Sequence, residues 1–305
     1  MTDGNADQLT IALTGATGLV GRRLHRQLTT VGHRVISLVR HQSNLAQPNT
    51  RYWNPDFPTP HLLDDVDVVV HLAGASIMGR FTKKHQRAIR ESRITPTRKL
   101  AELVAGSKSV QAMVCASAVG YYGNDVYQAV TEATLPGTGF LAEVCKQWEV
   151  ACDPAHNAGK RVVNIRTGLV LDGSGGILKV LAALTKTGLN GPLGGGKQWF
   201  PWVGAADLCG IYQLAITDQS LTGPVNAVGP ELVTNAEFTR TLGAALRRPT
   251  LIPIPAFAPA LLLGRTGAKE LALASQKVIP QVLQDRGHQF QHPTAGEAIR
   301  AELLH

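Results

Sequence analysis

A glycine-rich turn near the N-terminus constrains the fold of this chain more than any other feature. An apolar run at 9–13 leads into the segment 15–21, which reads GATGLVG, and then into a stretch where Val20, Leu24 and Leu28 follow helical spacing. Glycines in such a turn let backbone N–H groups approach a pyrophosphate, and the N-terminus of the helix adds a favourable dipole. The order of strand, glycine turn and helix therefore predicts dinucleotide binding rather than a purely structural turn.

Short apolar runs alternate with helical patterns through the first half of the chain. Strands are expected at 35–39, 67–72, 110–115 and 161–165, and helices at 82–105 and 140–155. This alternation predicts an α/β fold, a Rossmann-type doubly wound parallel sheet. Pro96 predicts a kink in the first of these helices or the start of a new one.

The charge around the glycine turn bears on which dinucleotide binds. The 305 residues carry a net charge of +8, and no acid occurs between residues 8 and 55. NAD enzymes of this class usually have Asp or Glu after the second strand, but Arg40 stands there. An arginine can bind a 2′-phosphate through a fork of N–H groups, so the sequence favours NADP (NADPH). Arg22 is a second candidate, and a solvent-facing helix residue is the equal alternative for it.

A second basic cluster, residues 80–99, holds eight Lys or Arg and one acid, Glu91. The sequence pI of about 9.5 would suit nucleic-acid binding, but aromatic residues make up only 5% of the chain and no nucleic-acid-binding motif accompanies the charge. We therefore expect no nucleic-acid partner and a solvated basic face.

The cysteines and the apolar stretches bear on compartment and membrane. Four cysteines without metal-site spacing predict free thiols, no metal site and a cytoplasmic protein. The N-terminus lacks the apolar core of a secretory signal, and the apolar stretch 251–263 contains three prolines and is too short to span a bilayer. We expect no membrane partner.

The chain changes character after residue 171, with glycine-rich loops at 172–176 and 188–196 and a proline-punctuated stretch from Pro249. We expect residues 1–170 to form an NADP-binding Rossmann core. Residues 171–305 are expected to complete the sheet and to form a smaller C-terminal α+β lobe for the substrate.

Several longer motifs extend beyond the glycine turn. They read TGATGLVG (14–21), HLAGASI (71–77), SAVGYYG (117–123), IRTGLVL (165–171) and GPLGGGKQW (191–199). Together they resemble the extended and atypical short-chain dehydrogenase/reductase superfamily, and more narrowly its epimerase-like, NAD(P)-binding SDR39U1-like group, over roughly residues 9 to 300. From about residue 249 the chain resembles the domain of unknown function DUF1731.

The resemblance implies cofactor roles for matching positions. The residues around the pyrophosphate would be Gly15, Thr17, Gly18, Leu19, Val20 and Gly21. Arg40 would take the adenosine phosphate, and Leu72, Ala73 and Gly74 would lie along the adenosine ribose. Arg93 stands where relatives usually have Asn. It is expected to face the cofactor or an anionic substrate, and membership of the basic helix alone is the alternative.

The catalytic residues of the resembled superfamily are missing. Relatives use a Ser or Thr, a Tyr and a Lys, in which the Tyr transfers a proton and the Lys lowers the pKa of that Tyr. The three places hold Ala118, Leu141 and Cys145 here. Lys146 is one residue out of register, about 100° around the helix, so it does not substitute.

Three polar residues remain near the nicotinamide end: Ser117, Tyr121 and Tyr122. A tyrosine would donate a proton and Ser117 would bind a carbonyl. In the alternative interpretation, one tyrosine packs and the other makes a structural hydrogen bond. Trp199, Phe200 and Trp202 are candidates for lining the substrate pocket, and core packing is equally expected for them.

Two functions are therefore weighed. The first is an NADP-dependent oxidoreductase or nucleotide-sugar-epimerase-like enzyme acting on an unidentified small molecule, in which the cofactor carries the hydride. The second is a non-catalytic NADP(H)-binding sensor or scaffold, which the missing Ser, Tyr and Lys support. The protein is expected to be a monomer or a homodimer.

Overall fold

Seven parallel strands form the central sheet of the computed structural model, which describes residues 8–40, 48–188 and 190–304. Their order is β10-β7-β5-β4-β1-β2-β3. The bounds are β1 Thr10–Thr14, β2 Arg34–Val39, β3 Thr50–Tyr52, β4 Val68–His71, β5 Ala112–Ala118, β7 Arg161–Thr167 and β10 Gly223–Ala227. The expectation of a doubly wound parallel sheet is confirmed. The order reverses between β1 and β4, and ligands bind beyond the carboxyl ends of the strands at such a point.

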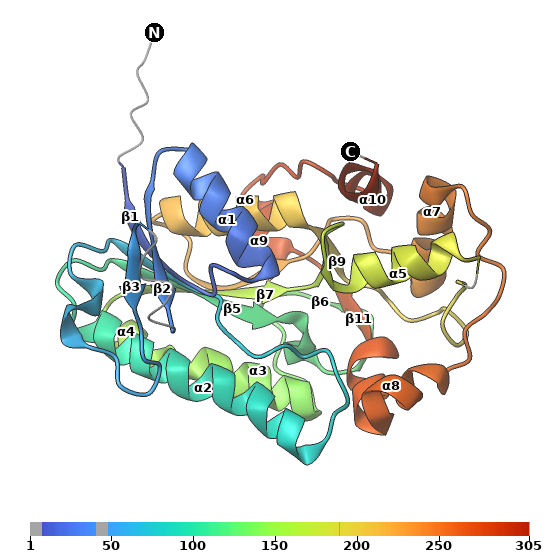
Figure 1. The fold of residues 1–305 in the computed structure, drawn as a ribbon, viewed down its shortest axis with the longest axis horizontal. Helices are drawn as coiled ribbons and strands as arrows, with labels where there is room; N and C mark the ends of the chain where they lie inside the picture. The colour runs from blue at the N-terminus through green and yellow to red at the C-terminus, as the bar shows by residue number, and fades with distance from the viewer. Residues whose placement is uncertain (1–7, 41–47, 189, 305) are drawn as a thin grey trace, which may run out of the picture.

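Helices cover both faces of this sheet (Figure 1). Helices α1 (Leu19–Thr30) and α6 (Ala205–Thr217) lie on one face, and α2 (Lys83–Gly106), α3 (Phe140–Val150) and α4 (Asp153–Asn157) lie on the other. Each face has its own core. Leu24 and Leu28 of α1 pack with Leu208 of α6, whereas Leu100 of α2 packs with Trp148 of α3. The two cores fix the positions of the loops that leave the strands.

Two of the predicted helices differ in detail. Helix α2 continues through Pro96, which is buried, so the predicted new start is wrong. The stretch 140–155 forms two helices instead of one. Helix α3 ends at Val150, and Pro154 lies in the first turn of α4, where a missing N–H costs no helical hydrogen bond.

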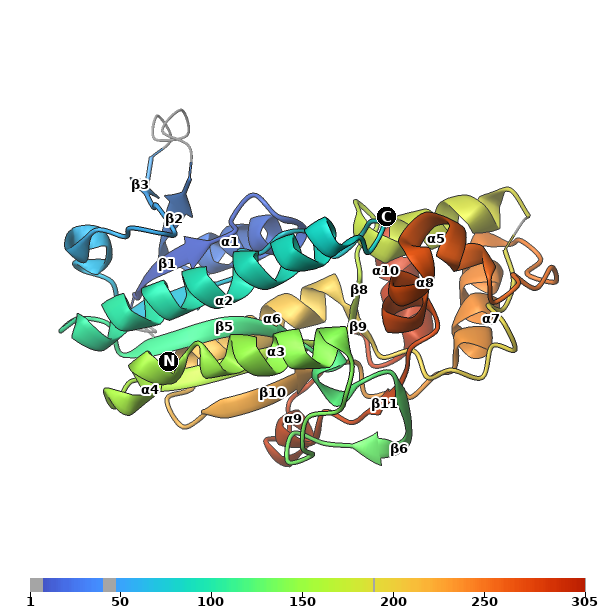
Figure 2. The same cartoon turned by 90° about the horizontal axis from the view of Figure 1, so that it is seen from below.

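Most of the remaining elements gather beyond the carboxyl ends of the strands (Figures 1 and 2), whereas the helix at Gln281–Asp285 packs against β10. Two short parallel pairs that the sequence reading missed join β6 to β11 and β8 to β9. The bounds are β6 Asp125–Val130, β8 Leu169–Leu171, β9 Trp202–Gly204 and β11 Ser275–Val278, with α5 Gly176–Lys186, α7 Asn235–Leu246, α8 Ala258–Gly267, α9 Gln281–Asp285 and α10 Ala295–Leu303. In the described residues, single helical turns also lie at Pro60–Leu63, before β4, and at Val119–Tyr122 and Ala268–Ala272.

The second half of the chain contributes to both parts of the molecule. Strand β10 forms an edge of the central sheet, and α6 covers one of its faces, whereas α5, α7 and α10 pack around Trp202 and Phe238. The boundary at residue 170 stays a prediction. In the described ranges, no helix is both long and apolar enough to cross a membrane.

Candidate functional site

The glycine turn joins β1 to α1 and packs too closely for side chains. Gly15 has a φ of +70°, and its carbonyl accepts a hydrogen bond from the N–H of Gly18 at 2.9 Å. A Cβ on Gly21 would lie 2.1 Å from that same carbonyl oxygen. Thr17 and Gly18, just before the first helical residue, are exposed. The turn therefore presents backbone amides at a helix N-terminus, an arrangement that fits a pyrophosphate.

A buried hydrogen bond ties this turn to the end of β4. The Thr14 hydroxyl accepts from the N–H groups of Leu72 and Ala73, at 3.1 and 3.2 Å, and lies 2.8 Å from Nδ1 of His71. Because the hydroxyl accepts twice, its own proton points to Nδ1, which makes the His71 ring neutral. Complete burial lowers the pKa of His71 to about 4. The start of the segment 72–74 is thereby held beside the turn, and its place along the adenosine ribose stays a prediction.

Distant acids neutralise part of the basic N-terminal stretch. Arg23 pairs with Asp172 and Glu302, in the second half of the chain. Arg34 and Arg51 both pair with Asp65. The charge of these three arginines therefore serves the fold.

Arg22 and Arg40 form no salt bridge with any described residue, and both are exposed. Arg40 follows β2 directly, at the carboxyl edge of the sheet. Arg22 donates to the carbonyl of Thr17 at 3.0 Å, so its guanidinium lies on the glycine turn. Positive charge thus remains at the edge where a phosphorylated dinucleotide would lie.

Arg93 reaches the same edge from α2. A Cβ on Gly74 would lie 3.2 Å from its guanidinium carbon, which stands 5.1 Å from the centroid of the Trp148 ring. Burial lowers the pKa of Arg93. The guanidinium is packed between α2, α3 and the loop after β4. Both interpretations given to this residue, a ligand contact and membership of the basic helix alone, stay predictions.

A buried ion pair occupies the region where Ser117 was expected to act. Arg166 of β7 and Glu149 of α3 pair through two hydrogen bonds of 2.9 Å, and only 3% of the Arg166 side chain is exposed. The Ser117 hydroxyl donates to Glu149 at 2.7 Å. Its single proton is therefore already committed within the protein.

The two tyrosines flank Arg166 in different ways. Tyr122 accepts from Arg166 at 2.9 Å and donates to Asn226 at 2.7 Å, and burial raises the pKa of Tyr122 to about 12. The Tyr121 ring lies under the Arg166 guanidinium, 3.5 Å from its carbon, and is half-buried. Among the three predicted residues, Tyr121 alone has a hydroxyl with no hydrogen bond to a described residue. The catalytic role of all three stays a prediction.

Glu149 and Arg166 are the main residues that the sequence reading missed. Arg166 lies in a mostly buried strand, directly after the buried Ile165. A charge in a buried strand requires a carboxylate, so the pattern RVVNIRT signals a buried pair without saying which acid completes it. Glu149 lies within α3, one helical turn after Cys145, and only the fold brings it next to β7.

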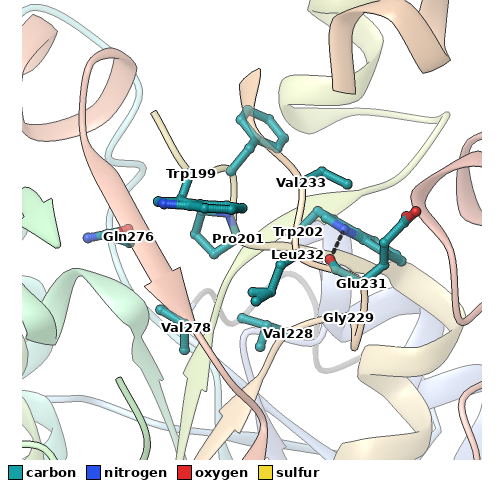
Figure 3. A pocket seen from close by; sticks show the side chains of 11 residues that line it. Trp199, Pro201, Trp202, Val228, Gly229, Glu231, Leu232, Val233, Gln276 and Val278 are labelled. Atoms are coloured by element: carbon teal, nitrogen blue, oxygen red, sulfur yellow. Dashed lines mark hydrogen bonds between the residues drawn. The ribbon is translucent and has the colours of Figure 1, made fainter. Parts of the chain in front are cut away.

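The aromatic cluster at 199–202 surrounds a small cavity (Figure 3). Trp199, Phe200 and Trp202 all line it, with Val228 and Val278 on its other side. Trp202 is 1% exposed, and its indole N–H donates to the Glu231 carbonyl at 3.0 Å, so it also packs in the core. These aromatic residues therefore line a cavity and, at Trp202, also pack in the core. That the cavity binds a substrate stays a prediction.

The described residues contain no group of three or more His, Cys, Asp or Glu that would hold a metal ion. All four cysteines are unpaired and buried. Burial raises the pKa of Cys145 to about 12, which opposes a role as a thiolate nucleophile.

Comparison with known proteins matches this geometry. Residues 11–229 match the NAD dependent epimerase/dehydratase family, and residues 254–302 match the domain of unknown function DUF1731. The chain is 42% identical over 292 residues to the epimerase family protein Mb2239 of Mycobacterium bovis, covering 95% of this chain and 96% of that one.

Two of the similar solved structures, each matching 97% of this chain, are the most informative. The nucleoside-diphosphate sugar epimerase from Corynebacterium glutamicum is 45% identical with a TM-score of 0.83, and the match spans 58% of that longer chain. The human epimerase family protein SDR39U1 (isoform 2), solved with NADPH, is 30% identical with a TM-score of 0.87 over 99% of its chain. By its sequence and its site, this chain is an NAD(P)-binding member of the NAD dependent epimerase/dehydratase family.

Proposed function

We propose that this protein is an NADP(H)-dependent oxidoreductase or nucleotide-sugar-epimerase-like enzyme acting on a small molecule. The observation that carries the preference for NADP is Arg40. It is an exposed cation without a salt bridge in the described chain, directly after β2, where an acid would repel a 2′-phosphate. The NADPH in the human SDR39U1 structure supports the same preference.

Different residues along the carboxyl edge of the sheet bind different parts of the dinucleotide. The turn residues Gly15, Thr17, Gly18, Leu19, Val20 and Gly21 hold the pyrophosphate. Arg40 and Arg22 bind the 2′-phosphate, and the segment Leu72–Gly74 lies along the adenosine ribose. When bound, the nicotinamide exchanges a hydride with a substrate carbon.

Tyr121 is proposed as the proton donor to the substrate oxygen. The protons of Ser117 and Tyr122 are already used, by Glu149 and Asn226, whereas the Tyr121 hydroxyl is uncommitted. Tyr122 then holds Arg166 directly, and Ser117 holds Glu149, the partner of Arg166. Arg166 in turn fixes the Tyr121 ring, which lies against its guanidinium.

The cofactor preference is tested by Arg40→Glu. The affinity for NADPH should fall by about 100-fold, because a charge-assisted phosphate contact is lost and replaced by repulsion, while the affinity for NADH stays unchanged. Isothermal titration measures both. Arg34→Gln is the matched control: it is an exposed arginine at the opposite end of the same strand, already paired with Asp65. Equal losses for NADPH and NADH would refute the assignment of Arg40.

One observation favours a second function, a non-catalytic NADP(H)-binding sensor or scaffold. Two of the three candidate hydroxyls are held in a buried network. Tyr121→Phe separates the two functions, because it removes one oxygen that bonds to no described residue. For an enzyme, kcat should fall by about 100-fold or more with NADPH affinity unchanged. For a sensor, neither wild type nor variant oxidises NADPH with any of a panel of aldehydes, ketones and nucleotide sugars.

We further propose a cytoplasmic protein, which the unpaired state of the four cysteines supports. Its monomeric or dimeric state stays a prediction that analytical ultracentrifugation measures.

A further inference from the structure

Arg93 is a half-buried cation without an acidic partner among the described residues. Its Nη1 donates to the carbonyl of Ile89 at 3.1 Å and to the hydroxyl of Ser92 at 3.4 Å, and both acceptors are neutral. Neither Nε nor Nη2 bonds to a described residue. Burying a charge costs free energy unless it is paired, so an uncompensated guanidinium at a ligand edge points to an acceptor supplied by the ligand.

The side chain is held in place with little freedom. One side of the guanidinium lies against Gly74, where a Cβ would come within 3.2 Å of it, and the Trp148 ring lies on another side. Trp148 is itself fixed, because its indole N–H donates to the Thr97 hydroxyl at 3.0 Å. Such a pre-organised guanidinium loses little entropy when it binds.

The sheet order indicates which half of a dinucleotide Arg93 would meet. Arg40 follows β2 and the glycine turn follows β1, so the adenosine phosphate and the pyrophosphate take those places. The rest of the dinucleotide must extend across the reversal point, over β4 and β5. The Arg93 guanidinium lies between Gly74, at the end of the segment proposed to lie along the adenosine ribose, and Trp148 of α3, the helix that carries position 145. This contact with α3 places it past that segment, toward the nicotinamide half.

Position 145 of α3 faces the same place. A Cβ on Gly120, after β5, would lie 3.8 Å from the Cys145 sulfur, and the charge of Arg93 acts against the upward shift in the pKa of the Cys145 thiol. At this place, α3 therefore contributes the neutral, buried Cys145, and α2 contributes the positive charge of Arg93.

We propose that Arg93 binds the nicotinamide half of the dinucleotide, at its phosphate and ribose, and so supplies from α2 the cation that α3 lacks at position 145. This inference rests on the proposed binding of NADP(H). It selects the cofactor over an anionic substrate as the ligand of Arg93.

Two ligands that share the adenosine end test it. NADPH contains both halves, whereas 2′,5′-ADP keeps the 2′-phosphate and lacks the nicotinamide half. In titrations of the full chain, Arg93→Met should weaken NADPH by 10- to 100-fold and leave 2′,5′-ADP within twofold of wild type. Arg93→Lys should retain most of the NADPH affinity, because it keeps the charge. Arg40→Glu is the matched contrast, since it should weaken both ligands.

A second variant tests the exchange of the cation between helices. Cys145→Lys in the Arg93→Met background should recover about tenfold in NADPH affinity, whereas in the wild-type background it places two cations together and should bring no gain. Thermal melting of each variant shows whether it is folded. If Cys145→Lys does not fold, the pair Arg93→Met and Arg93→Lys decides alone.

Three results would overturn the inference: equal weakening of NADPH and 2′,5′-ADP by Arg93→Met, no weakening of either, or a folded double variant that binds no better than Arg93→Met. Failure of the proposed function looks different, because the wild-type protein would then bind neither ligand.

Discussion

The two ends of the candidate site are held together by different kinds of contact. At the glycine turn, the contacts are backbone to backbone, and the carbonyl of Gly15 touches Gly18 and Gly21. At the proposed nicotinamide end, they are side chain to side chain, and Arg166 joins Glu149 and Tyr122. The first end depends on the absence of side chains in a short stretch. The second depends on charges that lie in separate elements.

This difference teaches where each end is sensitive. A backbone cradle fails through steric conflict, which no neighbouring residue relieves. A buried charge network fails through loss of a partner, which leaves an uncompensated charge. The predictions below test these two modes of failure.

The largest effect is expected from Gly21→Ala. Its Cβ would lie 2.1 Å from the Gly15 carbonyl oxygen, so the turn must move and NADPH affinity should fall by about 1000-fold or more. Gly210→Ala is the control, because a Cβ there, inside α6, meets no atom within 4 Å. Titration with NADPH measures both. A Gly21→Ala protein that binds like wild type would show that the turn is not the pyrophosphate site.

Glu149→Gln tests the second mode of failure. The side chain is 13% exposed and its partner Arg166 is 3% exposed, so the neutral variant leaves a buried guanidinium unpaired. The free energy of unfolding should fall by about 3–5 kcal/mol in urea titrations. Glu91→Gln breaks an exposed pair with Arg87 and should leave the unfolding midpoint unchanged. If both variants changed the free energy of unfolding by a similarly small amount, the Glu149–Arg166 pair would not be a main source of stability.

A smaller effect is expected from pH, through His71. Its pKa is about 4 in the folded protein and 6.5 as the ordinary value. The neutral ring is favoured by the fold, so its contribution is complete above pH 6.5 and is lost as pH falls through 4. At about 1.4 kcal/mol for each pKa unit, the loss of stability amounts to about 3.5 kcal/mol. His71→Asn should flatten the stability profile in this window, and an unchanged slope would exclude His71 as its cause.

The same contrast explains what could be predicted from the sequence. The glycine turn, the parallel sheet and the edge position of Arg40 follow from local patterns, because strand period, glycine spacing and charge are all visible within a few residues. The pairings of Arg23 with Glu302 and of Arg34 with Asp65 were invisible, since the acids lie far along the chain. Nor does any local pattern show that the Ser117 hydroxyl donates its hydrogen bond to Glu149.

Arg93 lies between these cases. Its position in the sequence indicates a ligand contact, but the basic run around it suggests a solvated face equally well. Packing, which no local pattern shows, distinguishes Arg93 from its neighbours, because Gly74 and Trp148 enclose Arg93, while Lys83, Lys84 and neighbouring cations of the same helix stay exposed.

The pairing of Arg23 with Glu302 has a consequence for how the site is assembled. Arg23 belongs to the helix that begins at the glycine turn, and 279 residues separate it from its partner in α10. The ribosome synthesises the glycine turn early and Glu302 late. For most of translation, the emerging chain therefore has the turn but not the Arg23–Glu302 ion pair that holds the following helix against α10. A C-terminal fusion that displaces α10 should leave the full-length protein in the same state, with a complete glycine turn but without the Arg23–Glu302 ion pair.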